Sequence, residues 1–165
     1  MVNQILVIGV GNEFRGDDAV GIRVARRLAE MALPGITVLE QSGEGADLMA
    51  AWEHANAVLL IDAAQSGAEP GTIYRFDAQE TSLPAEHFSF SSHAFGVAEA
   101  IEMARVLGNL PEHFVVYGIE GRNFRTGEGL CHAVEQSIET VIQRLLNEIQ
   151  QLTNATNYSP EQSNQ

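Results

Sequence analysis

The sequence predicts an α/β protein, a three-layer sandwich in which a twisted, mainly parallel sheet of about five strands has helices on both faces. The first observation behind this fold class is that short apolar runs alternate with longer segments of helical periodicity. The second is the length of 165 residues, which suits one domain. The third is a hydrophobic content of 45%, which is enough to fill the space between the layers.

The first half of the chain alternates between strands and helices. Residues 4–10 (QILVIGV) form an unbroken apolar run, which is typical of a strand buried on both faces. A helix begins at Asp17 or Asp18, and apolar residues recur at helical spacing as far as Met31, before a Pro-Gly pair ends the pattern. The other elements predicted in this half are strands over residues 36–39 and 57–61, a helix over residues 46–54 and an edge strand over residues 72–76.

A polar loop over residues 77–92 leads into the second half of the chain. The elements predicted there are a helix over residues 93–107, a strand over residues 113–119 and a helix over residues 129–152. Residues 153–165 contain one large apolar side chain, Tyr158, and so bury too little surface to offset their ordering entropy. We therefore expect one domain over residues 1–152 and a disordered tail over residues 153–165.

Composition excludes several classes of function. The formal net charge of −13 makes the chain a poor partner for nucleic acids and anionic membranes. All basic residues are arginines, so Schiff-base chemistry and the lysine of an ATP-binding P-loop are excluded. The single cysteine, Cys131, excludes an internal disulfide and fits a reducing compartment. Because there is neither an 18-residue apolar run nor a basic N-terminal signal segment, we expect a cytoplasmic protein.

The carboxyl ends of the strands are where parallel sheets bind ligands, and the first strand leads into a glycine-containing turn there. Residues 9–21 read GVGNEFRGDDAVG. A dinucleotide-binding turn would need a third glycine at position 14, where this chain has Phe14. Asp17 and Asp18 also stand where a pyrophosphate would need positive potential, so the pattern argues against a nucleotide site.

Two aspartates at strand ends are candidate functional carboxylates. Either Asp17 or Asp18 could cap the following helix, and we interpret Asp17 as the cap and Asp18 as the functional group. Asp62 directly follows the apolar run AVLLI, where an unpartnered buried carboxylate would be costly. The structural alternative for Asp62 is that it accepts hydrogen bonds from nearby loop amides.

His93 completes a set of possible metal ligands. It stands at the predicted start of a helix, whose positive dipole end would keep the imidazole neutral and able to bind a metal. In a doubly wound sheet, Asp18, Asp62 and His93 would all emerge at the carboxyl edge. Two carboxylates and one imidazole suit zinc, nickel, manganese or iron, and the residue types do not choose among them. An adjacent Cys131–His132 nucleophile pair is a weaker alternative, because neighbouring helical residues point about 100° apart.

The same residues carry a resemblance to a known family. The turn GVGNEFRGDDAVG, the segment Ile61-Asp62-Ala63 after the third strand, and Ser92-His93-x-x-Gly96 resemble the hydrogenase maturation proteases, which are hydrogenase-specific C-terminal endopeptidases. The resemblance spans the chain to about Leu152. It implies that Asp18, Asp62 and His93 are both the metal-binding and the catalytic residues. Some members of the family have glutamate where this chain has Asp18.

The resemblance also implies a fold, a substrate and a partner. The family fold is a twisted sheet with helices on both sides. Its members remove a short C-terminal extension from the precursor of a nickel–iron hydrogenase large subunit after nickel has been inserted. Nickel would therefore be supplied by the precursor, and no nucleic acid or membrane partner is expected. The two loops over residues 41–45 and 77–92 either help select the substrate or are variable surface.

Several functional alternatives stay open at this stage. Water could be activated by the metal or by an aspartate acting as general base. No Ser-His-Asp order or nucleophile elbow is present, which argues against an acyl-enzyme. The acidic surface could steer a basic precursor tail toward the site. A non-catalytic nickel-binding checkpoint or chaperone, and a metal-dependent hydrolase of small molecules, are the competing classes.

Overall fold

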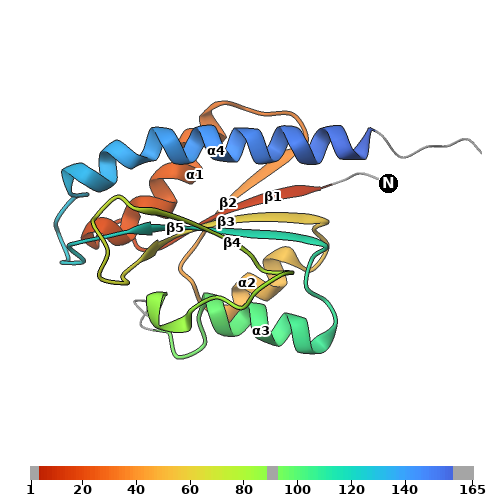
Figure 1. Ribbon diagram of the computed structural model, residues 1–165, viewed down its shortest axis with the longest axis horizontal. Coiled ribbons are helices and arrows are strands. Elements are labelled where there is room, and N and C mark those ends of the chain that lie inside the picture. Colours follow the sequence, from red (N-terminus) through yellow and green to blue (C-terminus); the bar gives the residue numbers. More distant parts are fainter. Residues whose placement is uncertain (1–3, 89–92, 158–165) are drawn as a thin grey trace, which may run out of the picture.

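A computed structural model of the chain describes residues 4–88 and 93–157. It confirms the predicted fold class: one sheet of five strands with helices on both faces (Figure 1). The strands are β1 (Ile5–Val10), β2 (Ile36–Gln41), β3 (Ala57–Ala64), β4 (Ile73–Asp77) and β5 (His113–Glu120). The helices are α1 (Val20–Glu30), α2 (Gly45–Trp52), α3 (Val97–Leu107) and α4 (His132–Thr156), with short 3-10 turns η1 (Gly16–Ala19) and η2 (Ala85–His87).

The strand order β2-β1-β3-β5-β4 places β3 in the middle of the sheet, between β1 and β5. Strands β2, β1, β3 and β5 run parallel, so their carboxyl ends meet at one edge. The edge strand β4 runs antiparallel to β5. This confirms the mainly parallel sheet and the edge position that the sequence predicted for residues 72–76.

Each strand contributes alternate residues to two separate cores. Val7 and Leu59 face the layer formed by α1 and α4, whereas Ile8 and Leu60 face the layer formed by α2 and α3. Figure 1 shows the two helix pairs on opposite sides of the sheet. Burial on both faces explains why these strands read as continuous apolar runs rather than as alternating patterns. No helix in the described part of the chain is long and apolar enough to cross a membrane.

Two glycines allow α1 to lie directly on the sheet. A Cβ at Gly21 would come within 2.4 Å of the carbonyl oxygens of both Val10 and Ile61. A Cβ at Gly9 would come within 2.3 Å of the carbonyl oxygen of Gly21. Because neither glycine has a side chain, the start of α1 packs against the carboxyl ends of β1 and β3, where the candidate residues lie.

The structure shifts the ends of several predicted elements. Helix α1 begins at Val20 and not at Asp17 or Asp18, because Gly16–Ala19 form a 3-10 turn. Strand β3 continues through Asp62 to Ala64 instead of ending at residue 61. Helix α3 begins at Val97, four residues after the predicted start at His93. Helix α4 spans His132–Thr156, so residues 153–156 are helical and do not belong to a disordered tail. Residues 158–165, the remainder of that tail, lie outside the described residues.

Candidate functional site

The candidate residues lie in three segments at the carboxyl edge of the sheet. Asp18 is in the turn η1 between β1 and α1, and Asp62 is near the end of β3. His93 lies in the segment that precedes α3. The N–H of Gly45, at the start of α2, donates to the carbonyl of Phe95 at 2.8 Å, which ties this segment to the helix that follows β2.

Asp17 is a structural residue that joins distant parts of the chain. Its side chain is fully buried. One carboxylate oxygen accepts the N–H groups of Arg122 and Asn123 at 2.7 and 2.9 Å, and the other accepts the N–H of Cys131 at 2.7 Å. Cys131 is the N-cap residue of α4. Asp17 therefore stabilises the loop between β5 and α4, and the expectation that it caps its own helix is wrong.

Asp18 is held differently, and its carboxylate has fewer partners. It is 8% exposed, and one of its oxygens accepts the N–H of Asn12 at 3.0 Å. Burial raises the pKa of Asp18 above the ordinary aspartate value, although the Asn12 hydrogen bond and the charge of Arg15 act in the opposite direction. Neither η1 nor α1 has a side-chain cap, so Asp18 is not a helix-capping residue either.

Asp62 is the most strongly perturbed carboxyl group of the site. It is 7% exposed, in the middle layer of the fold. Burial, together with the negative charge of Asp18, raises the pKa of Asp62 well above its ordinary value, and a backbone hydrogen bond from Ala63 compensates only in part. The two aspartates thus form a desolvated pair in which uptake of a proton or a cation relieves the repulsion.

His93 lies beside the loop that follows β2. Its Nε2 lies 3.4 Å from the hydroxyl oxygen of Ser42, in the loop after β2. Its charge also contributes to lowering the pKa of Glu44, after the larger effect of the N–H groups of Asp47 and Ala46 on that carboxylate. Since the helix begins only at Val97, the expected effect of a helix dipole on the His93 ring does not apply, because that effect is confined to the first turn.

The side chains of Asp18, Asp62 and His93 do not lie together as a metal-binding site. Within residues 4–88 and 93–157, no three His, Cys, Asp or Glu side chains lie together as an ion would require. Asp18 and Asp62 interact with each other, and His93 contacts Ser42. Asp18 and Asp62 carry carboxylate oxygens and His93 carries a ring nitrogen. These are the types of donor atom that first-row divalent ions bind.

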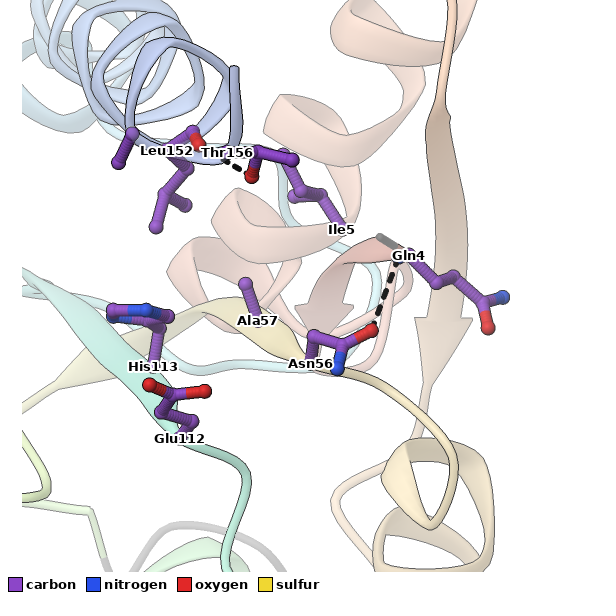
Figure 2. Close-up of a pocket in the computed structure, with 9 residues that line it drawn as sticks. Gln4, Ile5, Asn56, Ala57, Glu112, His113, Leu152 and Thr156 are labelled. Carbon is purple, nitrogen blue, oxygen red and sulfur yellow. Dashed lines mark hydrogen bonds between the residues drawn. The ribbon is translucent and has the colours of Figure 1, made fainter. Parts of the chain in front are cut away.

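A cleft lies beside Asn12 and Ser42, although neither Asp18 nor His93 lines it. It has a volume of about 280 Å³ and lies between the β1–η1 loop and the end of β2. Asn12, which donates to Asp18, and Ser42, which contacts His93, both line it. A larger cavity of about 380 Å³ lies at the opposite edge of the sheet, between the end of α4 and the start of β5 (Figure 2). None of the candidate residues lines that cavity.

Sequence reasoning missed a further buried acid at this edge. Glu120 ends β5 and is 1% exposed. Its carboxylate accepts the N–H groups of Ser66 and Gly67 at 2.8 to 3.0 Å and the hydroxyl of Ser66 at 2.9 Å. Glu120 therefore holds the turn that follows β3. The signal that could have found it is the one that identified Asp62, a carboxylate directly after an uncharged apolar strand.

Comparisons with known proteins identify similar sequences that cover most of the chain. A family model described as hydrogenase maturation protease matches residues 22–148. The chain is 31% identical over 153 residues to a putative hydrogenase maturation protease of Methanocaldococcus jannaschii, covering 88% of this chain and 96% of the other. It is 28% identical over 147 residues to the hydrogenase 2 maturation protease of Escherichia coli, covering 87% and 88%.

A solved structure shows the same fold. The hydrogenase maturating endopeptidase HybD from E. coli superposes on this chain with a TM-score of 0.76. The superposition covers 90% of this chain and 93% of the other, at 24% sequence identity.

Proposed function

Because the chain belongs to the hydrogenase maturation protease family, we propose that it removes the C-terminal extension from the precursor of a nickel–iron hydrogenase large subunit once nickel has been inserted. The observation that carries this proposal is the desolvated pair of Asp18 and Asp62 at the carboxyl edge of the sheet. Two buried carboxylates that repel each other form a site whose energy improves when a cation arrives.

Nickel enters this scheme as part of the substrate. Asp18 and Asp62 would offer carboxylate oxygens to a nickel ion carried by the precursor, and His93 would offer a ring nitrogen. A site of three protein ligands leaves positions open for the groups of the precursor. Because the described residues hold no preassembled ligand cluster, a nickel-free precursor would lack the contact that draws the three groups together.

The chemistry assigned to the pair is proton transfer during attack of water on the scissile carbonyl. A general base must be ionised when it acts, and a cation beside the pair would favour the ionised form of Asp62, whose pKa burial and the charge of Asp18 otherwise raise. Polarisation of the carbonyl by the bound nickel is the alternative contribution. Asp18, held by the N–H of Asn12, would orient the metal or the water beside Asp62.

The partner and the compartment follow from the same proposal. The precursor of the hydrogenase large subunit is the substrate, and the reaction would take place in the cytoplasm. The single cysteine, Cys131, which is partly buried and not in a disulfide, is consistent with a reducing compartment.

The proposal is tested by comparing two forms of the substrate. The purified protein is mixed with a nickel-loaded large-subunit precursor and, separately, with a nickel-free one, and the products are weighed by mass spectrometry. Loss of a C-terminal peptide from the loaded precursor alone is the expected result. Intact precursor in a stable complex would overturn the proposal in favour of a non-catalytic checkpoint. Equal cleavage of both forms would overturn the role of nickel.

A further inference from the structure

A second cleft at the carboxyl edge has the composition of an anion-binding site. It has a volume of about 600 Å³ and is lined by Gln65, Arg122, Asn123, Phe124 and Arg125. None of these five residues is acidic, in a chain whose formal net charge is −13. The lining residues thus include two arginines, and the neighbouring carboxylate of Glu128 accepts from the Asn123 amide and pairs with Arg125.

Arg122 differs from most arginines of this chain. Six arginines form ion pairs with glutamates, namely Arg23, Arg26, Arg27, Arg75, Arg105 and Arg125. Within residues 4–88 and 93–157, the exposed guanidinium of Arg122 has no such partner. The pair between Arg125 and Glu128 is long, at 3.9 Å, and both side chains are well exposed. Both guanidinium groups are therefore available to an incoming anion at little cost.

The loop that carries these arginines is fixed in place next to the catalytic pair. The buried carboxylate of Asp17 binds the N–H groups of Arg122 and Asn123. The side chain of Arg15 donates to the carbonyl of Phe124 at 3.3 Å, and the charge of the same arginine acts on Asp18. The backbone of the loop that lines the cleft is thus tied by hydrogen bonds to Arg15 and Asp17, next to Asp18 in the chain.

We infer that this cleft binds a carboxylate of the peptide substrate, with Arg122 as the main contact and Arg125 as the second. A planar guanidinium group pairs with a carboxylate through two parallel hydrogen bonds, and an adjacent second guanidinium adds to the specificity. The ring of Phe124 offers an apolar surface to the carbon atoms next to that carboxylate. The inference rests on the proposed function, because the carboxylate would belong to the C-terminal extension that the proposed reaction removes.

The carboxylate has two possible sources, which are the C-terminus of the extension and an Asp or Glu side chain within it. Three short probes separate them: N-acetyl-tetraalanine with a free C-terminus, N-acetyl-Ala-Ala-Glu-Ala-amide, and the uncharged N-acetyl-tetraalanine-amide. Each is titrated into the isotope-labelled full chain while the backbone amide resonances of residues 122–125 are followed by NMR. The expected result is saturable shifts with one or both carboxylate probes and none with the uncharged probe.

Variants assign the binding to the guanidinium groups. Arg122→Gln is expected to weaken binding of the carboxylate probe about tenfold, and Arg122→Lys to restore part of the loss, because lysine keeps the charge without the planar fork. Arg144→Gln is the matched control, since Arg144 is also exposed and has no ion pair within the described residues. Equal affinity for the uncharged probe, or unchanged affinity in Arg122→Gln, would overturn the inference.

A cleavage assay separates this inference from the proposed function. If the chain cleaves a nickel-loaded precursor, Arg122→Gln should raise KM about tenfold and leave kcat nearly unchanged, as loss of uniform binding does. If the chain cleaves no precursor but binds the carboxylate probes through Arg122, the proposed function fails and the carboxylate site stands. If cleavage occurs with an unchanged KM in the variant, the carboxylate site fails and the proposed function stands.

Discussion

The carboxylate of Asp17 accepts the N–H of Cys131 at 2.7 Å across a sequence separation of 114 residues. The same carboxylate binds the N–H groups of Arg122 and Asn123, so one buried side chain fixes the first loop of the chain against the start of the last helix. Within the described residues, the carboxylate of its neighbour Asp18 accepts one backbone hydrogen bond, from the N–H of Asn12. The two adjacent aspartates thus differ in their surroundings: Asp17 joins distant segments, and we expect Asp18 to serve the reaction instead.

Replacing Asp17 by alanine should destabilise the protein strongly. Three N–H groups would lose their acceptor, and each buried unsatisfied donor costs about 1–3 kcal/mol, so we expect a loss of about 3 kcal/mol or more. Urea unfolding followed by circular dichroism measures this free energy. Asp18→Ala, which removes one acceptor from a repelling pair, is the control and should change stability by less than about 1 kcal/mol. Equal losses in the two variants would contradict the separation of tasks.

Replacing Asp18 by asparagine should abolish most of the activity without unfolding the protein. The change keeps the shape of the side chain but removes its charge and weakens it as a metal ligand. We expect cleavage of nickel-loaded precursor to slow about a hundredfold or more, the usual contribution of a group that acts in the reaction. A single-turnover assay by mass spectrometry gives the rate. Full activity in this variant would remove Asp18 from the site.

Replacing Asp62 by asparagine should stabilise the protein at neutral pH while inactivating it. The pKa of Asp62 is raised in the folded state, so the folded protein binds this proton more tightly than the unfolded chain does. The corresponding stabilisation is present below the ordinary value of 3.8 and is lost as the pH rises through the folded-state pKa. The asparagine variant does not titrate and should be more stable by about 1 kcal/mol at pH 8.

The pH dependence provides the check on this prediction. Melting temperatures of the wild type and of Asp62→Asn are measured at pH 5 and at pH 8. The advantage of the variant should be larger at pH 8, where the wild-type carboxyl group is more fully ionised. An advantage that shrinks as the pH rises would show that burial does not raise the pKa of this group.

The close contact between α1 and the sheet predicts that even a methyl group added at Gly21 will destabilise the protein. In Gly21→Ala the new methyl group would meet the backbone oxygens of Val10 and Ile61, neither of which can move without disturbing the sheet. We expect a loss of about 1–3 kcal/mol in unfolding free energy, as overpacking usually causes. Gly129→Ala is the control, because no atom lies within 4 Å of a Cβ at that position. Similar losses in both variants would argue against the contact.

The buried acid at the end of β5 should also matter for stability. Glu120→Gln places an amide where the N–H groups of Ser66 and Gly67 now meet a charged acceptor. Loss of these charge-assisted hydrogen bonds should cost about 2 kcal/mol. Thermal unfolding measures the effect, with the exposed Glu112→Gln as control. A neutral outcome for Glu120→Gln would mean that the turn after β3 does not depend on this carboxylate.

The strands could be predicted because their residues are buried on both faces. Leu59 and Leu60 point into different cores, so an apolar run without alternation indicated a central strand correctly. The end of β3 could not be predicted in the same way, because aspartate is a poor strand residue. In the structure Asp62 lies opposite Gly118 of β5, which has no side chain. That neighbour is 56 residues away and is invisible to a local pattern.

The sequence predicts only part of the candidate site. Asp18 and Asp62 form the interacting pair that their places after strands suggested. A local pattern cannot show what Asp17 binds, because the partners of its carboxylate lie at residues 122–131. The predicted start of α3 is too early, since the signal for the true start is the N–H of Gly96 donating to the carboxylate of Glu99. The assignment of Asp18, Asp62 and His93 to nickel stays a prediction.

The strand order has a consequence for how the protein is made. Strand β4 is synthesised directly after β3, yet β5 separates the two in the sheet. While the chain leaves the ribosome, β4 has no native neighbour and β3 has an open edge until β5 emerges. The N–H groups that hold Asp17 emerge later still, with the segment up to Cys131. A nascent chain therefore carries Asp18, Asp62 and His93 before the segment that fixes the loop around Asp17 and Asp18 has been made.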